Sequence, residues 1–299
     1  MEIFKENWNG KVEELSIGTE ERTITLGGAG TLPFLDFEGT VPHPPKLALE
    51  LHDSVNPDWN PHLKNIWGTL PLEEWIKKIE TLAPDMICVR HVSADPDLEN
   101  APAEEVCRRL KRILDLTEYP LIITGCGNPA KDQDILPALA ETARGRNALI
   151  GVCTQDNYRT LAAAAVAGSH SLIAESPLDV NLAKQLNILI SDMGLPANRI
   201  VMHHTTGGLG YGLEYCYSIM ERCRLAALSG DRMLSSPMLN FAGEFSWNSK
   251  EAKESEETGI VWETVTGISY LESGADLLIL NHPQSLARIR RAVRSFMEA

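Results

Sequence analysis

The sequence predicts an α/β fold, a (βα)8 TIM barrel in residues 46–299 that follows an N-terminal extension in residues 1–45. Two observations lead to this prediction. From residue 46 onward, short apolar segments alternate with helix-length segments, which indicates parallel strands joined by crossover helices. Eight such units in about 250 residues fit a closed barrel better than an open doubly wound sheet, which usually has fewer strands and a nucleotide-binding fingerprint.

The predicted strands share the continuous apolar character of strands that are covered on both faces. They are residues 47–51, 86–90, 121–124, 148–152, 171–174, 200–203, 238–241 and 277–280. Glycines recur after the helical segments, at the place where a left-handed residue closes the last turn of a helix. These glycines are Gly145, Gly168, Gly194, Gly230 and Gly274.

The helix after the fifth strand has the clearest predicted ends. Ser176 is the predicted N-cap, Pro177 takes the first helical position, and Asp179 takes the third, where its carboxylate complements the helix dipole. Gly194 ends the helix, and Pro196 follows it.

The first 45 residues lie outside the repeat. Residues 22–26 predict a strand, and the glycine-rich residues 27–30 and the apolar residues 32–35 come after it. No helix pattern follows the glycines, so they do not form a dinucleotide-binding motif. We expect a hairpin that plugs the N-terminal end of the barrel.

Composition narrows the choice of partners and of cellular location. The formal charge of −14 and the lack of a basic stripe exclude nucleic acid as an expected partner. No apolar run approaches the roughly 20 residues that span a bilayer, and residues 1–6 lack the regions of a signal peptide, so we expect a cytoplasmic protein without a membrane segment. Six cysteines occur without Cys-x-x-Cys spacing, so no iron–sulfur cluster is expected in this chain. Cys216 and Cys223 fall on one helical face.

The polar residues after the strands are the place to look for chemistry, because barrel sites are built there. His52, His91, His203 and His204 could bind a metal ion, but the first strand has no His-x-His pair, and we predict no metal site. No predicted strand contains the lysine that a Schiff-base aldolase needs. The glycine-rich loops follow strands three and six, whereas phosphate sites of barrels usually follow strands seven and eight. We therefore predict no catalytic residue.

Residues 242–258, after the seventh strand, combine aromatic and charged residues. The charged half is predicted to be a solvated surface. Phe245 and Trp247 are expected to cover a ligand or to meet a partner.

Several motifs occur together and in a fixed order along nearly the whole chain. They are LPF (32–34), FEG (37–39), GCGNPAKD (125–132), NY (157–158), SPLDVNLAKQLN (176–187), GGLGYGLEY (207–215), GIVWE (259–263) and HP (282–283). With these motifs the sequence resembles the small subunit of the corrinoid iron–sulfur protein, which is equivalent to the delta subunit of the archaeal acetyl-CoA decarbonylase/synthase complex.

The resemblance implies a barrel like those of pterin-binding methyltransferases, paired with a large subunit that carries the [4Fe–4S] cluster. A corrinoid would be shared between the two subunits. The complex would carry a methyl group from methyl-tetrahydrofolate or an archaeal pterin to acetyl-CoA synthase, with the methyltransferase and the synthase as transient partners. A corrinoid needs hydrogen-bonding groups and glycines on its host surface more than an acid or a base. The residues expected to contact it are Asn128, Gln155, Asn157, His204, Thr205, Thr206, Gly207, Gly208 and Asn240.

The sequence departs from the family pattern on this same face. His203 and His204 stand where an Asp-Pro pair is expected, and the second strand ends in Arg90 and His91. The ordinary pKa of histidine, about 6.5, would let His204 change the local charge near pH 6 to 7. Two other functions stay open at this point. The chain could be a pterin-dependent corrinoid methyltransferase that acts alone, with Asn128 and Asn157 on the pterin, or a scaffold subunit that does not touch the ligand.

Overall fold

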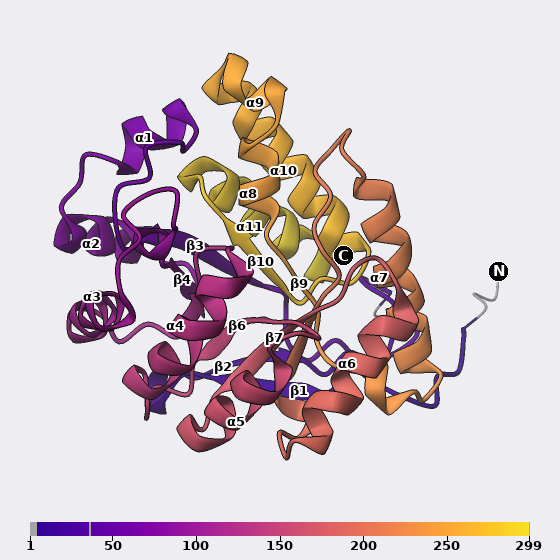
Figure 1. The fold of residues 1–299 in the computed structure, drawn as a ribbon. Coiled ribbons are helices and arrows are strands. Elements are labelled where there is room, and N and C mark those ends of the chain that lie inside the picture. The colour runs from indigo at the N-terminus through magenta and orange to yellow at the C-terminus, as the bar shows by residue number, and fades with distance from the viewer. Residues whose placement is uncertain (1–4, 36, 299) are drawn as a thin grey trace.

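Eight parallel strands form a barrel in the computed structural model, which describes residues 5–35 and 37–298. The strands follow one another around the barrel in the order β8-β7-β6-β5-β4-β3-β10-β9, and a parallel bridge between Met202 and Met238 closes the ring (Figure 1). Their bounds are β3 (Lys46–His52), β4 (Met86–Arg90), β5 (Leu121–Thr124), β6 (Leu149–Cys153), β7 (Ser171–Glu175), β8 (Ile200–His203), β9 (Leu239–Asn240) and β10 (Leu277–Leu280). The predicted (βα)8 fold class is thereby confirmed.

Helices surround the strands and cover their outer faces (Figure 1). They are α1 (Pro61–Trp67), α2 (Leu72–Leu82), α3 (Ala103–Leu116), α4 (Pro129–Thr142), α5 (Tyr158–Gly168), α6 (Val180–Asp192), α7 (Leu213–Leu228), α8 (Ala242–Trp247), α9 (Lys250–Glu254), α10 (Glu256–Glu272) and α11 (Pro283–Met297). Short 3-10 turns are η1 (Glu20–Arg22), η2 (Val92–Ala94), η3 (Ala197–Arg199) and η4 (Arg232–Leu234).

Each strand buries both of its faces, and the period of two separates its side chains into two cores. In β3, Leu47 and Leu49 pack outward against the helices, while Ala48 packs inside the barrel. In β4, Ile87 packs outward, and Met86 packs inward. This double burial explains why the strands have continuous apolar sequences.

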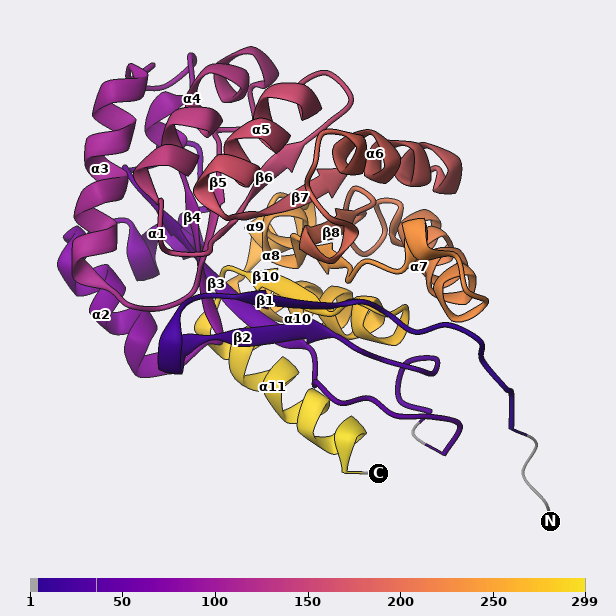
Figure 2. The same cartoon turned by 90° about the horizontal axis from the view of Figure 1, so that it is seen from below.

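A hairpin lies across the amino-terminal end of the barrel. Its antiparallel strands are β1 (Glu14–Ile17) and β2 (Ile24–Gly27), and Figure 2 shows them from below. Leu15, Ile17 and Leu26 pack against the inward side chains of the barrel strands. The strand predicted at residues 22–26 begins two residues and ends one residue before β2, and β1 was not predicted. The division of the chain at residue 46 stays a prediction, and residues 1–4 of the segment considered for a signal peptide lie outside the described residues.

The predicted helix ends are right in most places and wrong in two. Gly145, Gly194, Gly230 and Gly274 have positive φ angles after their helices. After α5, however, the left-handed residue is Ser169, with φ of 58°.

The second error concerns α6. Its N-cap is Asp179, whose side chain accepts hydrogen bonds from the backbone N–H groups of Asn181 and Leu182. Ser176 and Pro177 therefore precede the helix. The carboxylate, placed three residues after Ser176, competes successfully for the free N–H groups of the first turn.

The segment after β9 is mostly core. Trp247, which we expected at a ligand or partner surface, is 1% exposed, stacks on His282 and donates a hydrogen bond to Glu263. Phe245 is half-buried at the mouth of the barrel. Cys216 and Cys223, whose spacing predicted one helical face, both lie on α7 and are buried. Among the described helices, none is long and apolar enough to cross a membrane.

Candidate functional site

The inward side chains change from apolar to polar toward the carboxyl ends of the strands. The side chains two positions further along the strands form the next inward layer, which is mostly polar and lies at the open end of the barrel. This layer, which we call the upper layer, consists of Glu50, Arg90, Thr124, Glu175, His203, Phe241 and Asn281.

A cavity of about 430 Å³ lies above the upper layer. Arg90, His203 and Phe241 contribute to its lining, and the loops after β5 and β6 form part of its wall. The volume is that of a site for a small organic ligand. Because the hairpin covers the opposite end, the cavity opens on the carboxyl side of the strands.

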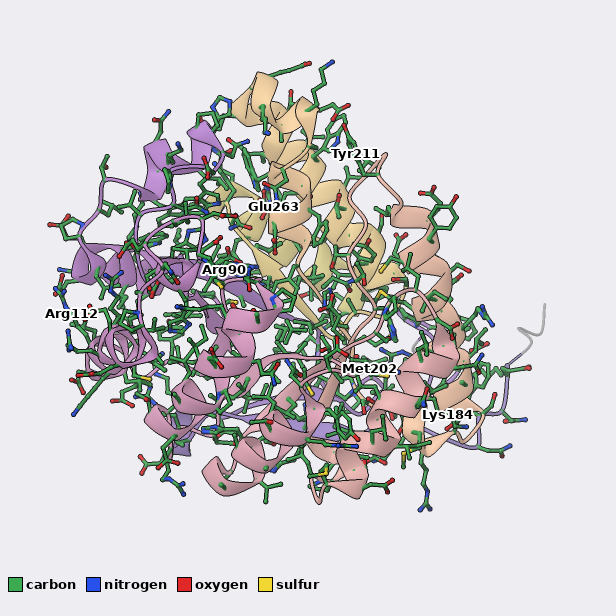
Figure 3. All side chains as sticks on the ribbon, in the orientation of Figure 1. Arg90, Arg112, Lys184, Met202, Tyr211 and Glu263 are labelled. Atoms are coloured by element: carbon green, nitrogen blue, oxygen red, sulfur yellow. The ribbon has the colours of Figure 1, made fainter. Side chains whose placement is uncertain are left out.

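Arg90 is the fixed cation of this site (Figure 3). Its Nε lies 3.2 Å from Glu50 Oε1, and its Nη2 lies 3.2 Å from Glu50 Oε2 and 2.5 Å from Glu244 Oε2. Burial alone would raise the pKa of Glu50, but Arg90 and His52 lower it to about 2. Burial opposes the charge of Arg90, yet Glu244 and Glu50 raise its pKa. The guanidinium and the Glu50 carboxylate therefore stay ionised near neutral pH.

His203 is neutral and points one ring nitrogen toward Glu175. Its pKa falls to about 3, first because the ring is buried and also because His204 and Arg90 are nearby. Its Nε2 lies 3.0 Å from Thr206 Oγ1, which also accepts a hydrogen bond from the backbone N–H of Phe241. Within the described chain, the Thr206 hydroxyl has these two partners, and since the Phe241 N–H is a donor, the hydroxyl can donate its hydrogen to His203 Nε2. The proton of the neutral ring is therefore assigned to Nδ1.

Glu175 faces that N–H group. Its Oε1 lies 3.6 Å from His203 Nδ1, which is too long for a hydrogen bond. Burial, with a contribution from Glu244, raises the pKa of Glu175. The cavity thus holds an acceptor pair, the two Glu175 oxygens, beside a donor, His203 Nδ1–H.

The loop after β5 is shaped by Asp132. Its carboxylate accepts hydrogen bonds from the backbone N–H groups of Cys126 and Gly127, at 2.8 and 3.0 Å. Asn128, a predicted ligand residue, is the N-cap of α4 and accepts a hydrogen bond from the backbone N–H of Lys131. The amide oxygen of Asn128 thus has a structural role, while its NH2 group makes no hydrogen bond within the described part of the chain.

The two predicted residues after β6 lie differently. Asn157 lines the cavity, but its side chain bridges the loop, accepting from Thr154 N–H and donating to the Val152 carbonyl. Gln155 is exposed and lines a second hollow of about 260 Å³ between the loops after β6 and β7.

The predicted residues after β8 mostly make contacts within the fold, and whether they touch a corrinoid stays a prediction. Thr206 is 2% exposed and holds His203. Thr205 has a φ angle of 62° and is half-buried. Gly207 donates its N–H to Tyr270 Oη, and a Cβ atom there would lie 2.4 Å from Gly212. This glycine is needed for a close backbone approach.

Gly208 and Asn240 also lie outside the cavity lining. A Cβ on Gly208 would lie 3.1 Å from the Phe245 carbonyl oxygen. Asn240 is fully buried, with its Nδ2 3.6 Å from Cys216 Sγ on α7. The residues predicted to contact the corrinoid therefore do not form one cluster in the fold.

The predicted charge change of His204 near neutral pH is wrong. It is 1% exposed, and its Nδ1 lies 3.4 Å from Ser176 Oγ. Burial lowers its pKa to about 4, so His204 does not change charge near pH 6 to 7.

The chain is similar to proteins of one family over nearly all of its length. The sequence model of the family described as "CO dehydrogenase/acetyl-CoA synthase delta subunit" matches residues 14–289. The chain belongs to this family. The resemblance that the sequence motifs indicated is therefore confirmed.

Relatives within the delta subunit family include proteins from two archaea. The acetyl-CoA decarbonylase/synthase complex subunit delta of Archaeoglobus fulgidus is 31% identical, and the match covers 97% of this chain and 69% of that protein. The same subunit of Methanocaldococcus jannaschii is 30% identical, with 95% and 74% covered.

Solved structures that share the fold are dihydropteroate synthases. The enzyme of Xanthomonas albilineans, solved with 4-aminobenzoic acid, gives a TM-score of 0.57 at 12% identity, with 95% of this chain and 98% of that chain covered. The Yersinia pestis enzyme gives 0.59 at 10% identity, with 96% and 99% covered. At this low identity the likeness shows only that this chain shares their barrel fold.

Residues of the upper layer were missing from the predicted ligand set. A signal for them was present in the sequence: Glu50 interrupts the apolar run LALELH, and Arg90 ends the apolar run MICVR. A charge inside a buried strand requires a partner. Counting by two along each strand would have placed Glu50, Arg90, Glu175 and His203 inside the barrel.

Proposed function

We propose that this chain is the small subunit of a corrinoid iron–sulfur methyl carrier. It forms a heterodimer with a large subunit that carries the iron–sulfur cluster, and the two hold the corrinoid between them. The complex carries a methyl group from methyl-tetrahydrofolate or an archaeal pterin to acetyl-CoA synthase, with the methyltransferase and the synthase as transient partners. The chain itself positions and shields the cofactor in the cytoplasm. Membership in the delta subunit family supports this proposal.

The observation that carries the proposal is the form of the open end of the barrel. A hollow of about 430 Å³ is suited to a drug-sized molecule and cannot enclose a cobamide, which is far larger. A corrinoid on this face would lie across the rim, and its other side would need a second protein. This supports a site that is shared between two subunits.

The residues at the rim suit such a group. A corrinoid carries amide side chains around its ring, and these exchange hydrogen bonds with amides and carboxylates. Gln155 and Asp156 are exposed, and Asn128 is half-buried with its NH2 group outside the capping bond. We propose that these side chains hold the periphery of the corrinoid, which supplies a cobalt centre for methyl transfer when bound. Asn157, Thr206 and Asn240 would support the loops from inside the fold.

The test is co-expression with a candidate large subunit in anaerobic medium supplied with corrinoid. A 1:1 complex whose visible spectrum shows bound cobamide is the expected result. Gln155→Ala should lower the corrinoid content of the complex, while Glu104→Gln, which removes a 90% exposed carboxylate from α3, should not. A stable heterodimer without corrinoid absorption would instead favour a scaffold subunit.

A further inference from the structure

A hollow of about 320 Å³ lies at the amino-terminal end of the barrel, on the side opposite to the cavity that Arg90 lines. Its wall comes from the start of β3, the residue before β4 and the last two turns of α11. The volume is at the lower end of the range for pockets that bind small organic molecules. The hollow shares no lining residue with the cavity, and the proposed function does not use it.

Three cations from two segments of the chain border this hollow. Lys46 is the first residue of β3, and Arg290 and Arg294 lie four residues apart on one face of α11. Within residues 5–35 and 37–298, the side chains of Lys46 and Arg294 form no ion pair and no hydrogen bond. The described part of the chain therefore leaves these two charges uncompensated.

Arg290 is held in place by the end of α2. Its Nη1 lies 3.1 Å from the Leu82 carbonyl oxygen, and its Nη2 lies 3.2 Å from the same oxygen and 2.6 Å from that of Ala83. The negative end of the α2 dipole favours a cation at this place. Because the partners are neutral carbonyls, the guanidinium keeps its net charge, and no ligand is needed to order the side chain.

The carboxylates of the lining do not cancel these cations. Asp85 Oδ2 accepts a hydrogen bond of 2.8 Å from the Leu47 N–H, which holds this carboxylate at the start of the strand. Glu298 and Arg294 are both exposed, so water and salt weaken both of their charges. The half-buried charges of the lining are then the cations Lys46 and Arg290 against Asp85 alone. In a chain with a formal charge of −14, this hollow attracts an anion.

Apolar side chains form the rest of the wall. Val293 is buried and Met297 is half-buried beside the two arginines of α11. Pro44 and Pro45 precede β3, and their rings fix the backbone, so this wall keeps its shape without a ligand. An inorganic ion would leave the apolar surface bare, whereas an anion with a compact apolar body would cover it.

We propose that this hollow binds a phosphate monoester with a compact apolar body. The phosphate group carries about −1.5 to −2 charges at pH 7 and three acceptor oxygens, and arginine and lysine are the side chains that recognise it. It would lie between Lys46 and Arg294, with Arg290 as the third cation, while the apolar body packs on Val293 and Met297. The proposal does not rest on the proposed function, because the hollow lies at the other end of the barrel.

Calorimetric titration of the purified full chain at low salt tests the proposal, with phenyl phosphate as the probe. Saturable binding with a Kd of about 1 mM or less is expected. Inorganic phosphate lacks the apolar body and benzoate carries a single charge, so each should bind at least about threefold more weakly. The proposal is wrong if phenyl phosphate shows no saturable binding up to about 10 mM, or if either of the other anions binds as tightly.

Charge-matched variants test whether the binding occurs in the hollow. Lys46→Gln combined with Arg294→Gln removes two of its cations and should weaken phenyl phosphate binding by about tenfold or more. Lys77→Gln combined with Arg291→Gln removes two exposed cations of α2 and α11 that do not line the hollow, and should change the Kd by less than about twofold.

Equal weakening in the two double variants would mean that the probe responds only to net charge, and would overturn the proposal. Thermal unfolding followed by circular dichroism checks that both variants fold. If the variant with Lys46→Gln does not fold, the comparison of the three anions on the unaltered chain still decides. Because these titrations use the free chain without a corrinoid, their failure leaves the proposed function untouched.

Discussion

Glu50 on β3 and Arg90 on β4 form an ion pair inside the barrel, with both side chains directed to its open end. The side chain of Glu50 is 3% exposed and that of Arg90 is 14% exposed, and two oxygen–nitrogen distances of 3.2 Å join them. Replacing both partners of a buried ion pair by apolar residues usually costs far less stability than removing one partner alone.

Arg90→Met should therefore destabilise the protein. The change leaves Glu50 buried without its main partner, and we expect the free energy of unfolding to fall by about 3–5 kcal/mol in urea titrations. Arg112→Met is the matched control, because Arg112 pairs with Glu73 on the surface and is 60% exposed; it should cost less than about 1 kcal/mol. Equal losses in the two variants would contradict the account.

The penalty of Arg90→Met should also depend on pH. Because the pKa of Glu50 is lowered to about 2, its ionised form stabilises the folded state above the ordinary value of 4.5, and this stability is lost as pH falls toward 2. The difference in unfolding free energy between the two proteins should accordingly shrink from pH 5 to pH 2.5. A difference that stays constant over this window would show that Glu50 does not depend on Arg90.

Glu263 should produce the opposite pH dependence. It lies on α10 and is fully buried, and it accepts hydrogen bonds from Trp247 Nε1 on α8 and from the Asn281 N–H, yet burial raises its pKa to about 7. The folded state keeps this proton while the unfolded chain releases it above pH 4.5, so stability falls as pH rises from 4.5 to 7.

Glu263→Gln should remove that slope. Relative to the unaltered protein, the variant should gain up to about 3 kcal/mol between pH 5 and pH 8, as followed by urea unfolding. Glu104→Gln is the control for the loss of one surface carboxylate. A constant difference between Glu263→Gln and the unaltered protein would mean that Glu263 is ionised throughout this range.

The hairpin offers a test of its packing. Ile17 is fully buried against the barrel interior, and its neighbour Ser16 is exposed on the other face of β1. Ile17→Ala should cost about 2–5 kcal/mol, whereas Ser16→Ala should change stability by less than about 0.5 kcal/mol in the same thermal or urea experiment. Equal, small effects would show that the hairpin is not part of the cooperative fold.

Gly259 on α10 provides a steric test. A Cβ atom there would lie 2.2 Å from the Trp247 ring, so Gly259→Ala should destabilise by about 1–3 kcal/mol despite the better helix propensity of alanine. At Gly30 the nearest atom is 3.9 Å away, and Gly30→Ala should change stability by less than about 1 kcal/mol. A stabilised Gly259→Ala variant would show that α10 can move away from Trp247.

The barrel could be predicted because its information is local. Each buried strand is a continuous apolar run, and helix ends such as Gly194 and Gly274 need a left-handed conformation that glycine adopts freely. The strand β1 was missed because it has only four residues, ELSI, and is defined by packing against the barrel. Ser176 was predicted as the N-cap because Pro177 and Asp179 follow it at positions typical of a first helical turn, and local sequence does not decide between Ser176 and Asp179 as caps.

The site was harder to predict for a different reason. Loop residues such as Asn157 and Thr206 have polar groups, but tertiary contacts decide whether those groups bind the backbone or a ligand. Conversely, Glu175 and His203 come from two neighbouring strands and lie 28 residues apart in the sequence, so only the barrel shows that they meet. The sequence shows that each alternates with apolar residues along its strand, but it does not show that the two strands place them at the same level along the barrel axis.

The β1–β2 hairpin has a consequence for the order of events during assembly. It covers one end of the barrel, so a small molecule reaches the cavity through the loops at the other end. A large subunit seated on those loops would slow both entry and escape. If the proposed heterodimer forms on these loops, a molecule that occupies the cavity should exchange fast in the free chain and slowly in the complex.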